Sequence, residues 1–301
     1  MKTQTSAALA WGGVLLAGVL WGVGALVAQS VMMNGMTPYS LSLARFALGL
    51  PLLWCWHWRQ AATPSAARWR HLSRRDRALI IGTGVAMALN VTCWFAGITL
   101  IGAALPTVIS ICCAPVLVAL LSVLLGYERA SARLLSALLL ALGGVALIVA
   151  TGDLSLPPHY AMGLAWSFAS AALYALVVLG NARMPRQVSA VTASAWSMSV
   201  AALLLLALAV MQGITWPRDG VAWLQVGYTG VFTTSIAYLV FAWGARRLSP
   251  TATVVGTLVE PLVAAVAAAW LLGQPLTGQQ GLGAVLLGLA MLLLARRSAS
   301  A

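Results

Sequence analysis

The stretch PTATVVGTLVEPLVAAVAAAWLL, residues 250–272, decides the fold class. Glu260 is its one charged residue, and the segment is long enough to exceed the roughly 20 mostly apolar residues that a helix needs to cross a bilayer. The segment therefore predicts a transmembrane helix. Similar apolar runs recur along the whole chain, so the same argument extends outward in both directions.

The composition of the whole chain agrees with a membrane protein. Of its 301 residues, 61% are hydrophobic and only 7% are charged, whereas a soluble domain typically carries about 25% charged residues. The net charge of +12 does not indicate a nucleic-acid-binding protein, because the basic residues lie at regular breaks between apolar runs. The run from Ala7 to Val31 exceeds the roughly 7–15-residue core of a signal peptide, so we expect a retained first helix.

Apolar runs of spanning length recur ten times, which predicts an all-α membrane protein with ten transmembrane helices. The breaks between them are short and carry turn residues such as Asn34-Gly35 and Ser249-Pro250. The predicted spans are residues 8–31, 38–58, 78–100, 103–126, 134–151, 161–182, 189–212, 221–244, 250–272 and 280–295.

The distribution of Lys and Arg predicts the orientation. With ten spans and a cytoplasmic N-terminus, all but two of the 17 basic residues fall on the cytoplasmic side. The exceptions are Arg45, within a span, and Arg218, on the outside. Because basic residues gather on cytoplasmic loops, we expect a multi-pass protein of the bacterial inner membrane with both termini in the cytoplasm. The Arg-rich loop 59–77 follows the same rule and also suits anionic lipid headgroups.

The two halves of the chain resemble each other. In the fourth span Pro115 is followed eleven residues later by Gly126, and in the ninth Pro261 is followed twelve residues later by Gly273. A proline within a span removes a backbone hydrogen bond and kinks the helix. Pro115 and Pro261 therefore predict helix kinks at matching places, and the sequence leaves open whether these kinks also lie beside a cavity.

An odd number of spans in each half has a topological consequence. Five spans per half make the second half enter the membrane from the opposite side, which predicts two inverted five-helix repeats within one membrane domain. The first repeat is residues 1–151 and the second is residues 152–301. Inverted repeats are typical of transporters, in which the substrate site lies near the bilayer midplane between the repeats.

Several motifs, taken in order, are similar to those of the EamA-type families of the drug/metabolite transporter superfamily. They are Trp21-Gly22, Arg45-Phe46, Pro115 to Gly126, and Pro261 to Gly273. Within the superfamily the chain resembles the aromatic amino acid exporters, a likeness to which Ala245-Arg246-Arg247 contributes. The resemblance implies a secondary transporter or facilitator that exports aromatic and other apolar amino acids. Gln274 departs from the Gly-Glu pair that many members have after the ninth span.

Two ionisable residues are predicted within the spans, Arg45 and Glu260. Such residues are costly in lipid and are functional candidates by default. Three roles are open to them. The two side chains pair with each other, or they bind the carboxylate and the ammonium group of an amino acid. In the third, both are structural: Arg45 caps backbone carbonyls and Glu260 remains protonated. The sequence alone leaves these alternatives open.

Aromatic and polar side chains alternate at helical spacing along several spans. Such a face is unfavourable toward lipid, so it points at the bundle or at a cavity, where it either packs against other helices or binds substrate. The candidate substrate-binding residues are Trp21, Asn90, Trp94, Trp166, Ser170, Tyr174, Ser235, Tyr238 and Glu260.

No constellation typical of an enzyme occurs in the sequence. His57, His71 and His159 have no ligand or catalytic partners at suitable spacing, so neither a metal nor a cofactor is expected. A G-x-x-x-x-G-K-[ST] motif is absent, which argues against ATP-driven transport within this chain. Neither the filter loop nor the ring of like residues typical of a channel is apparent.

The expected partners are the lipid bilayer and a small-molecule substrate, with no nucleic acid. An exporter of other amphipathic metabolites or drugs is the alternative within the same class, and an intramembrane enzyme or a channel is the alternative of a different class. The sequence leaves open proton coupling, the direction of net flux and the oligomeric state, for which a monomer is plausible.

Overall fold

The structure, a computed structural model of the chain, describes residues 2–61, 69–101, 104–149, 159–185, 187–272 and 278–298. These residues are helical apart from short turns, with no strand among them. Gly273 and Gln274, which the sequence comparison singled out, lie outside the described residues. The elements are α1 (Lys2–Met33), α2 (Pro38–Ala61), the 3-10 helix η1 (Trp69–His71), α3 (Arg74–Ile101), α4 (Ala104–Leu124), α5 (Ala132–Val149), α6 (Tyr160–Arg183), α7 (Ala190–Gln212), α8 (Gly220–Tyr228), the π-helix η2 (Thr229–Ile236), α9 (Ala237–Ala245), α10 (Pro250–Thr257), α11 (Val259–Leu272) and α12 (Gly278–Ser298).

The all-α prediction is confirmed for the described residues, and each predicted span is helical there. Among the described residues, five helical segments are long and apolar enough to cross a membrane, and four shorter apolar segments accompany them. The five are Ala7–Met33, Arg74–Ile98, Tyr160–Arg183, Ala190–Gln212 and Gly220–Ala245; the shorter ones are Cys113–Leu124, Ala132–Leu147, Pro250–Val263 and Gly281–Leu294.

Polar caps and glycines set where several helices begin and end. The side chains of Ser189, Asp219 and Ser249 each accept a hydrogen bond from the backbone N–H three residues later, at the starts of α7, α8 and α10. These bonds satisfy N–H groups that have no partner in the first helical turn. Gly35 and Gly126 follow the ends of α1 and α4 with φ of 94° and 72°, a left-handed conformation that favours glycine.

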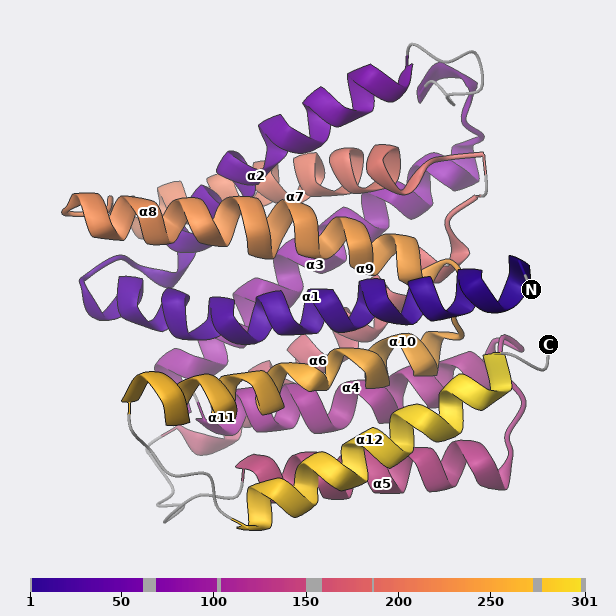
Figure 1. Cartoon of the computed structure of the whole chain (residues 1–301). Helices are drawn as coiled ribbons and strands as arrows, with labels where there is room; N and C mark the ends of the chain where they lie inside the picture. Colours follow the sequence, from indigo (N-terminus) through magenta and orange to yellow (C-terminus); the bar gives the residue numbers. More distant parts are fainter. Residues whose placement is uncertain are drawn as a thin grey trace.

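The helices of the two halves interlock rather than forming two separate bundles (Figure 1). α1 leaves its own half and packs against α9, α10 and α11, and α6 packs in the same way against α3 and α4. On the two sides of this centre, α2 packs against α7 and α5 against α12. The start of α1 and the end of α12 lie at the same end of the bundle.

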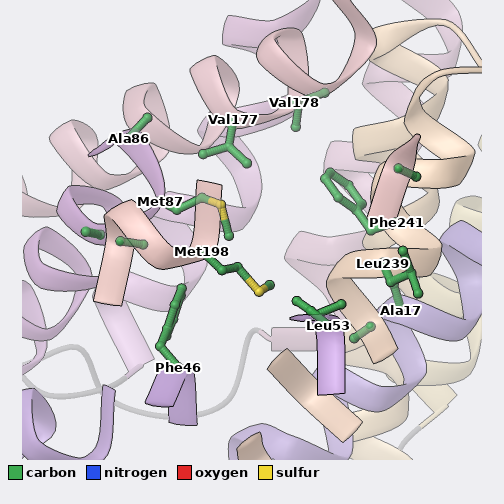
Figure 2. Close-up of a cluster of buried hydrophobic side chains, with 14 of the residues drawn as sticks. Ala17, Phe46, Leu53, Ala86, Met87, Val177, Val178, Met198, Leu239 and Phe241 are labelled. Carbon is green, nitrogen blue, oxygen red and sulfur yellow. The ribbon is translucent and has the colours of Figure 1, made fainter. Parts of the chain in front are cut away.

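The largest hydrophobic core joins the two halves. Figure 2 shows Phe46 of α2 and Met87 of α3 close to Met198 of α7, with Ala17 of α1 and Phe241 of α9 in the same cluster. All five side chains are buried. The core therefore joins α7 to α1, α2, α3 and α9, four helices that also contribute to the cavity described next.

Candidate functional site

A cavity of about 170 Å³ lies between helices of both halves. Its walls mix aromatic, hydroxyl, amide and charged side chains with small apolar ones. The residues that line it are Trp21, Gly24, Ala25, Ala28, Arg45, Asn90, Val91, Trp94, Ser110, Ala114, Ser170, Tyr174, Thr233, Tyr238, Val254, Thr257, Leu258 and Glu260. A mostly apolar lining with a few placed polar groups is the usual composition of a small-molecule site.

The cavity contains one cationic and one anionic side chain. Arg45 reaches it from α2 and Glu260 from the first turn of α11. Arg45 Nε also donates a hydrogen bond to Thr234 Oγ1 at 3.3 Å. This bond fixes the guanidinium against the π-helix while the side chain remains at the cavity wall.

The π-helix η2 forms one wall of the site. Within the π-helix, Thr234 Oγ1 donates to the backbone carbonyl of Thr229 at 2.9 Å. Ser235 Oγ joins the π-helix to α2, because it donates to the backbone carbonyl of Gly49 at 2.6 Å. The carbonyl of Thr233 accepts instead from Trp21 Nε1 at 2.8 Å. π-helices are rare and occur frequently at functional sites, and this one lies against a residue of the cavity.

The ninth predicted span is interrupted at the cavity. α10 ends at Thr257 and α11 begins at Val259. Pro261 explains the break, because it lacks a backbone N–H and its ring clashes with the carbonyl four residues earlier, which belongs to Thr257. Thr257 Oγ1 lies 3.2 Å from the hydroxyl of Tyr174, and both residues line the cavity. Interrupted helices of this kind frame the substrate sites of many transporters.

Hydrogen bonds and ring contacts hold the other polar and aromatic side chains in place. Asn90 Nδ2 donates to the backbone carbonyl of Ser170 at 2.9 Å and to its hydroxyl at 3.0 Å, which joins α3 to α6. Trp21 and Tyr238 meet edge to face with ring centroids 5.1 Å apart, a favoured geometry for aromatic pairs. The rings therefore form a fixed surface rather than mobile side chains.

Glycines in α1 allow this helix to approach both α11 and the π-helix η2 closely. A Cβ atom at Gly22 would lie 2.6 Å from the backbone oxygen of Glu260, and one at Gly24 would clash with Thr233. The structure therefore has close helix packing at both glycines. Any larger residue at either position would push α1 away from the cavity wall.

Most of the sequence-predicted site residues meet at this cavity. Asn90 and Trp94 come from α3, Ser170 and Tyr174 from α6, and the others from helices of both halves. The prolines predicted as kinks are both buried within helices, and each follows a cavity residue, Ala114 or Glu260. The predicted residues that line the cavity are Trp21, Asn90, Trp94, Ser170, Tyr174, Tyr238, Glu260 and Arg45.

Trp166 lies away from the cavity, which corrects its expected place beside Ser170 and Tyr174. Its side chain is 39% exposed and is absent from the cavity lining. Residues four apart on an α-helix differ by about 40° around the axis, so two such steps turn the side chain by roughly 80°. Trp166 also lies about 12 Å along α6 from Tyr174 at 1.5 Å per residue.

Ser235 is also displaced from its expected place in the lining. Its side chain is fully buried and bonds to the carbonyls of Gly49 and Gly230. The prediction assumed the α-helical period, but Ser235 lies in the π-helix, where the wider turn changes which residues share a face. Tyr238, just beyond the π-helix, does line the cavity.

Several cavity residues were missed from the sequence, among them Ser110, Thr233 and Thr257. One signal was available. The run YTGVFTTS, residues 228–235, places four hydroxyl residues after Tyr228 within an apolar span, and such side chains can satisfy backbone groups where a membrane helix departs from α geometry. Ser110 carried no comparable signal. Among the described residues, no group of His, Cys, Asp or Glu side chains has the arrangement of a metal site.

Comparison with known proteins places this architecture among transporters. The sequence profile of the EamA-like transporter family matches residues 8–150 and again residues 161–296. A crystal structure of another protein superposes with a TM-score of 0.81 over 97% of this chain and 98% of that chain. The two sequences are 19% identical, so this likeness shows a shared fold.

The similar proteins are named as transporters rather than enzymes. YicL, an uncharacterized inner membrane transporter of Salmonella typhimurium, is 28% identical over 277 residues, which cover 91% of each chain. YwfM, an uncharacterized transporter of Bacillus subtilis, is 27% identical over 290 residues, covering 93% of this chain and 92% of YwfM. An uncharacterized transporter of Archaeoglobus fulgidus is 25% identical over 273 residues.

Proposed function

Because the chain belongs to the EamA-like transporter family, we propose that it is a secondary transporter that exports amino acids across the bacterial inner membrane. The observation that carries this proposal is the presence of Arg45 and Glu260 in one cavity among aromatic side chains. A guanidinium is the natural partner of an α-carboxylate, and a carboxylate is the natural partner of an α-ammonium group. The rings of Trp21 and Tyr238 suit an aromatic or apolar side chain.

The cavity volume favours a small substrate. A dry cavity of about 150 Å³ accommodates benzene, whereas drug-sized ligands occupy pockets of roughly 300–1,000 Å³. The cavity volume of about 170 Å³ is closer to that of the benzene-sized cavity than to that of a drug-sized pocket. This supports an amino acid or another small amphipathic metabolite over a large drug.

We further propose that the chain is built from two inverted five-helix repeats, residues 1–151 and 152–301. The helix contacts support this, because each half places its first helix against the third and fourth spans of the other half. α1 packs against η2, α9, α10 and α11, which form the eighth and ninth spans, and α6 packs against α3 and α4. α2 packs against its counterpart α7, and α5 against its counterpart α12. The two matches of the family profile agree with such a duplication.

In this account two groups of helices, each containing helices of both repeats, rock against each other to expose the cavity alternately. Ten spans with both termini in the cytoplasm follow from the charge distribution, and the common end of α1 and α12 supports an even number of crossings. Several hydrogen bonds join the two repeats, among them one at α10. Glu128 Oε1, from the first repeat, accepts a hydrogen bond from the backbone N–H of Thr251 at 2.9 Å, at the start of α10 in the second.

Flux measurements on the purified protein test the proposal. We expect proteoliposomes to take up radiolabelled aromatic and apolar amino acids saturably, and empty liposomes to show no such uptake. Repeating the assay with an imposed pH gradient separates proton-coupled transport, which the gradient accelerates, from facilitated diffusion, which it leaves unchanged. Uptake of other amphipathic metabolites without any amino acid would overturn the proposed substrate class.

A further inference from the structure

Three buried hydroxyls of the described helices, those of Ser110, Ser122 and Thr251, have no hydrogen-bond partner, and of these Ser110 lines the cavity. Ser42, Thr83, Thr92 and Ser199 each donate a hydrogen bond to the backbone carbonyl four residues earlier, which is a usual way to satisfy a hydroxyl inside a helix. Ser110 Oγ is buried and has no hydrogen-bond partner among the described residues. Its donor and its acceptor capacity are both unused.

Ser110 lies in the wall of the substrate cavity. It is one helical turn from Ala114, and both residues of α4 line the cavity. Ser110 Oγ bonds neither Arg45 nor Glu260, and it comes from α4, whereas those residues come from α2 and α11. Native structures rarely leave buried hydroxyls unpaired, because an unpaired hydroxyl loses its hydration without compensation. The partner of Ser110 is therefore expected to arrive with the ligand.

We infer that Ser110 binds a hydroxyl group on the side chain of the transported amino acid, so that the protein favours hydroxylated side chains over matching apolar ones. This inference rests on the proposed function and refines it. Arg45 and Glu260 suffice for the carboxylate and the ammonium group that all amino acids share, which leaves Ser110 for the part that differs. A serine hydroxyl both donates and accepts, so it complements an alcohol or a phenol.

Selectivity follows from the same physical argument. A site that hydrogen-bonds a substrate hydroxyl rejects the analogue that lacks it, because binding of the analogue leaves the buried protein group unpaired. Tyrosine and phenylalanine form one such pair, and threonine and valine form a second pair of nearly equal shape. Wild-type protein should transport the hydroxylated member of each pair more efficiently.

The test measures flux of all four amino acids into proteoliposomes that contain wild type, Ser110→Ala, Ser110→Thr or Ser42→Ala. We expect Ser110→Ala to reduce the tyrosine-to-phenylalanine and threonine-to-valine ratios of kcat/KM by roughly 3- to 10-fold, the range that one net hydrogen bond supplies. Ser110→Thr keeps the hydroxyl and should retain the preference in part. Ser42→Ala removes a hydroxyl that is satisfied within its own helix and lies outside the cavity, so both ratios should remain at the wild-type value.

The alternative outcomes are distinct. Unchanged ratios in Ser110→Ala, or an equal loss for both members of each pair, would overturn the inference while leaving the proposed function intact. An equal loss would assign Ser110 to the groups that all amino acids share. If wild-type protein transports none of the four, the proposed amino acid substrate and this inference both fail.

Discussion

Gly22→Ala is a small perturbation with a large expected effect. A Cβ atom at this position would lie 2.6 Å from the backbone oxygen of Glu260 and 2.9 Å from Cβ of Val263. The first distance is about 0.8 Å short of the 3.4 Å at which ordinary contact begins. Because one of the two atoms is backbone, a side-chain rotation cannot relieve the clash, and α1 must move away from α11.

The expected penalty is that of overpacking a well-packed interface, about 1–3 kcal/mol in the free energy of unfolding. Transport should fall as well, because Trp21 and Glu260 line the cavity on the two sides of this contact. Thermal unfolding in nanodiscs measures the first effect, and proteoliposome flux measures the second.

Gly12→Ala is the matched control in the same helix. Gly12 is exposed, and a Cβ atom there would meet nothing within 4 Å. The control should be neutral or stabilised, since alanine is favoured over glycine in a helix by up to about 1 kcal/mol. If the two variants unfold at the same temperature and transport equally well, the close approach of α1 to α11 is wrong.

Three further predictions concern the cavity lining, the π-helix and the topology. Tyr238→Ala should reduce flux of aromatic amino acids by about 2- to 10-fold, from roughly 0.5–1.5 kcal/mol per aromatic contact. Trp166→Ala, outside the cavity lining, should transport normally. Equal losses in the two variants would mean that the flux does not depend on the cavity. Trp21→Phe retains a ring but loses the hydrogen bond to the π-helix, so backbone amides of residues 229–236 should exchange faster in hydrogen-exchange measurements, and unchanged exchange would assign no role to that bond. In a cysteine-free background, an impermeant maleimide added to intact cells should label a cysteine at position 34 and not one at position 130, and the reverse pattern would invert the proposed orientation.

The helices and much of the cavity lining follow from local properties of the sequence. Apolar run length predicts the helices, and Ser249-Pro250, predicted as a turn, is the N-cap and first residue of α10. Arg45, Asn90 and Glu260 are polar residues inside spans, and all three line the cavity. The physical reason is that a polar group facing lipid would lack a partner, so such residues face the interior.

The parts that could not be predicted depend on contacts between distant segments. The π-helix is held by Trp21, 212 residues from Thr233, and by the bond from Ser235 to Gly49, 186 residues away. No local pattern specifies these pairings, and the assumed α-helical period therefore misplaced Ser235. The exposed position of Trp166 likewise depends on how α6 is rotated against α3 and α4, which side-chain spacing alone does not fix.

Glu260→Gln provides the most direct test of the central claim, that this cavity binds and moves amino acids through its charged pair. The measurement is counterflow of a radiolabelled amino acid in proteoliposomes, with wild type, Glu260→Gln and the charge-retaining Glu260→Asp, repeated at two pH gradients. If the carboxylate binds the substrate ammonium group, Glu260→Gln should weaken amino acid exchange and spare uncharged amphipathic substrates, and Glu260→Asp should retain part of the activity. Loss of the pH-gradient effect with intact exchange would instead assign Glu260 to proton coupling. Amino acid exchange by Glu260→Gln that equals the wild type at both gradients would contradict the account.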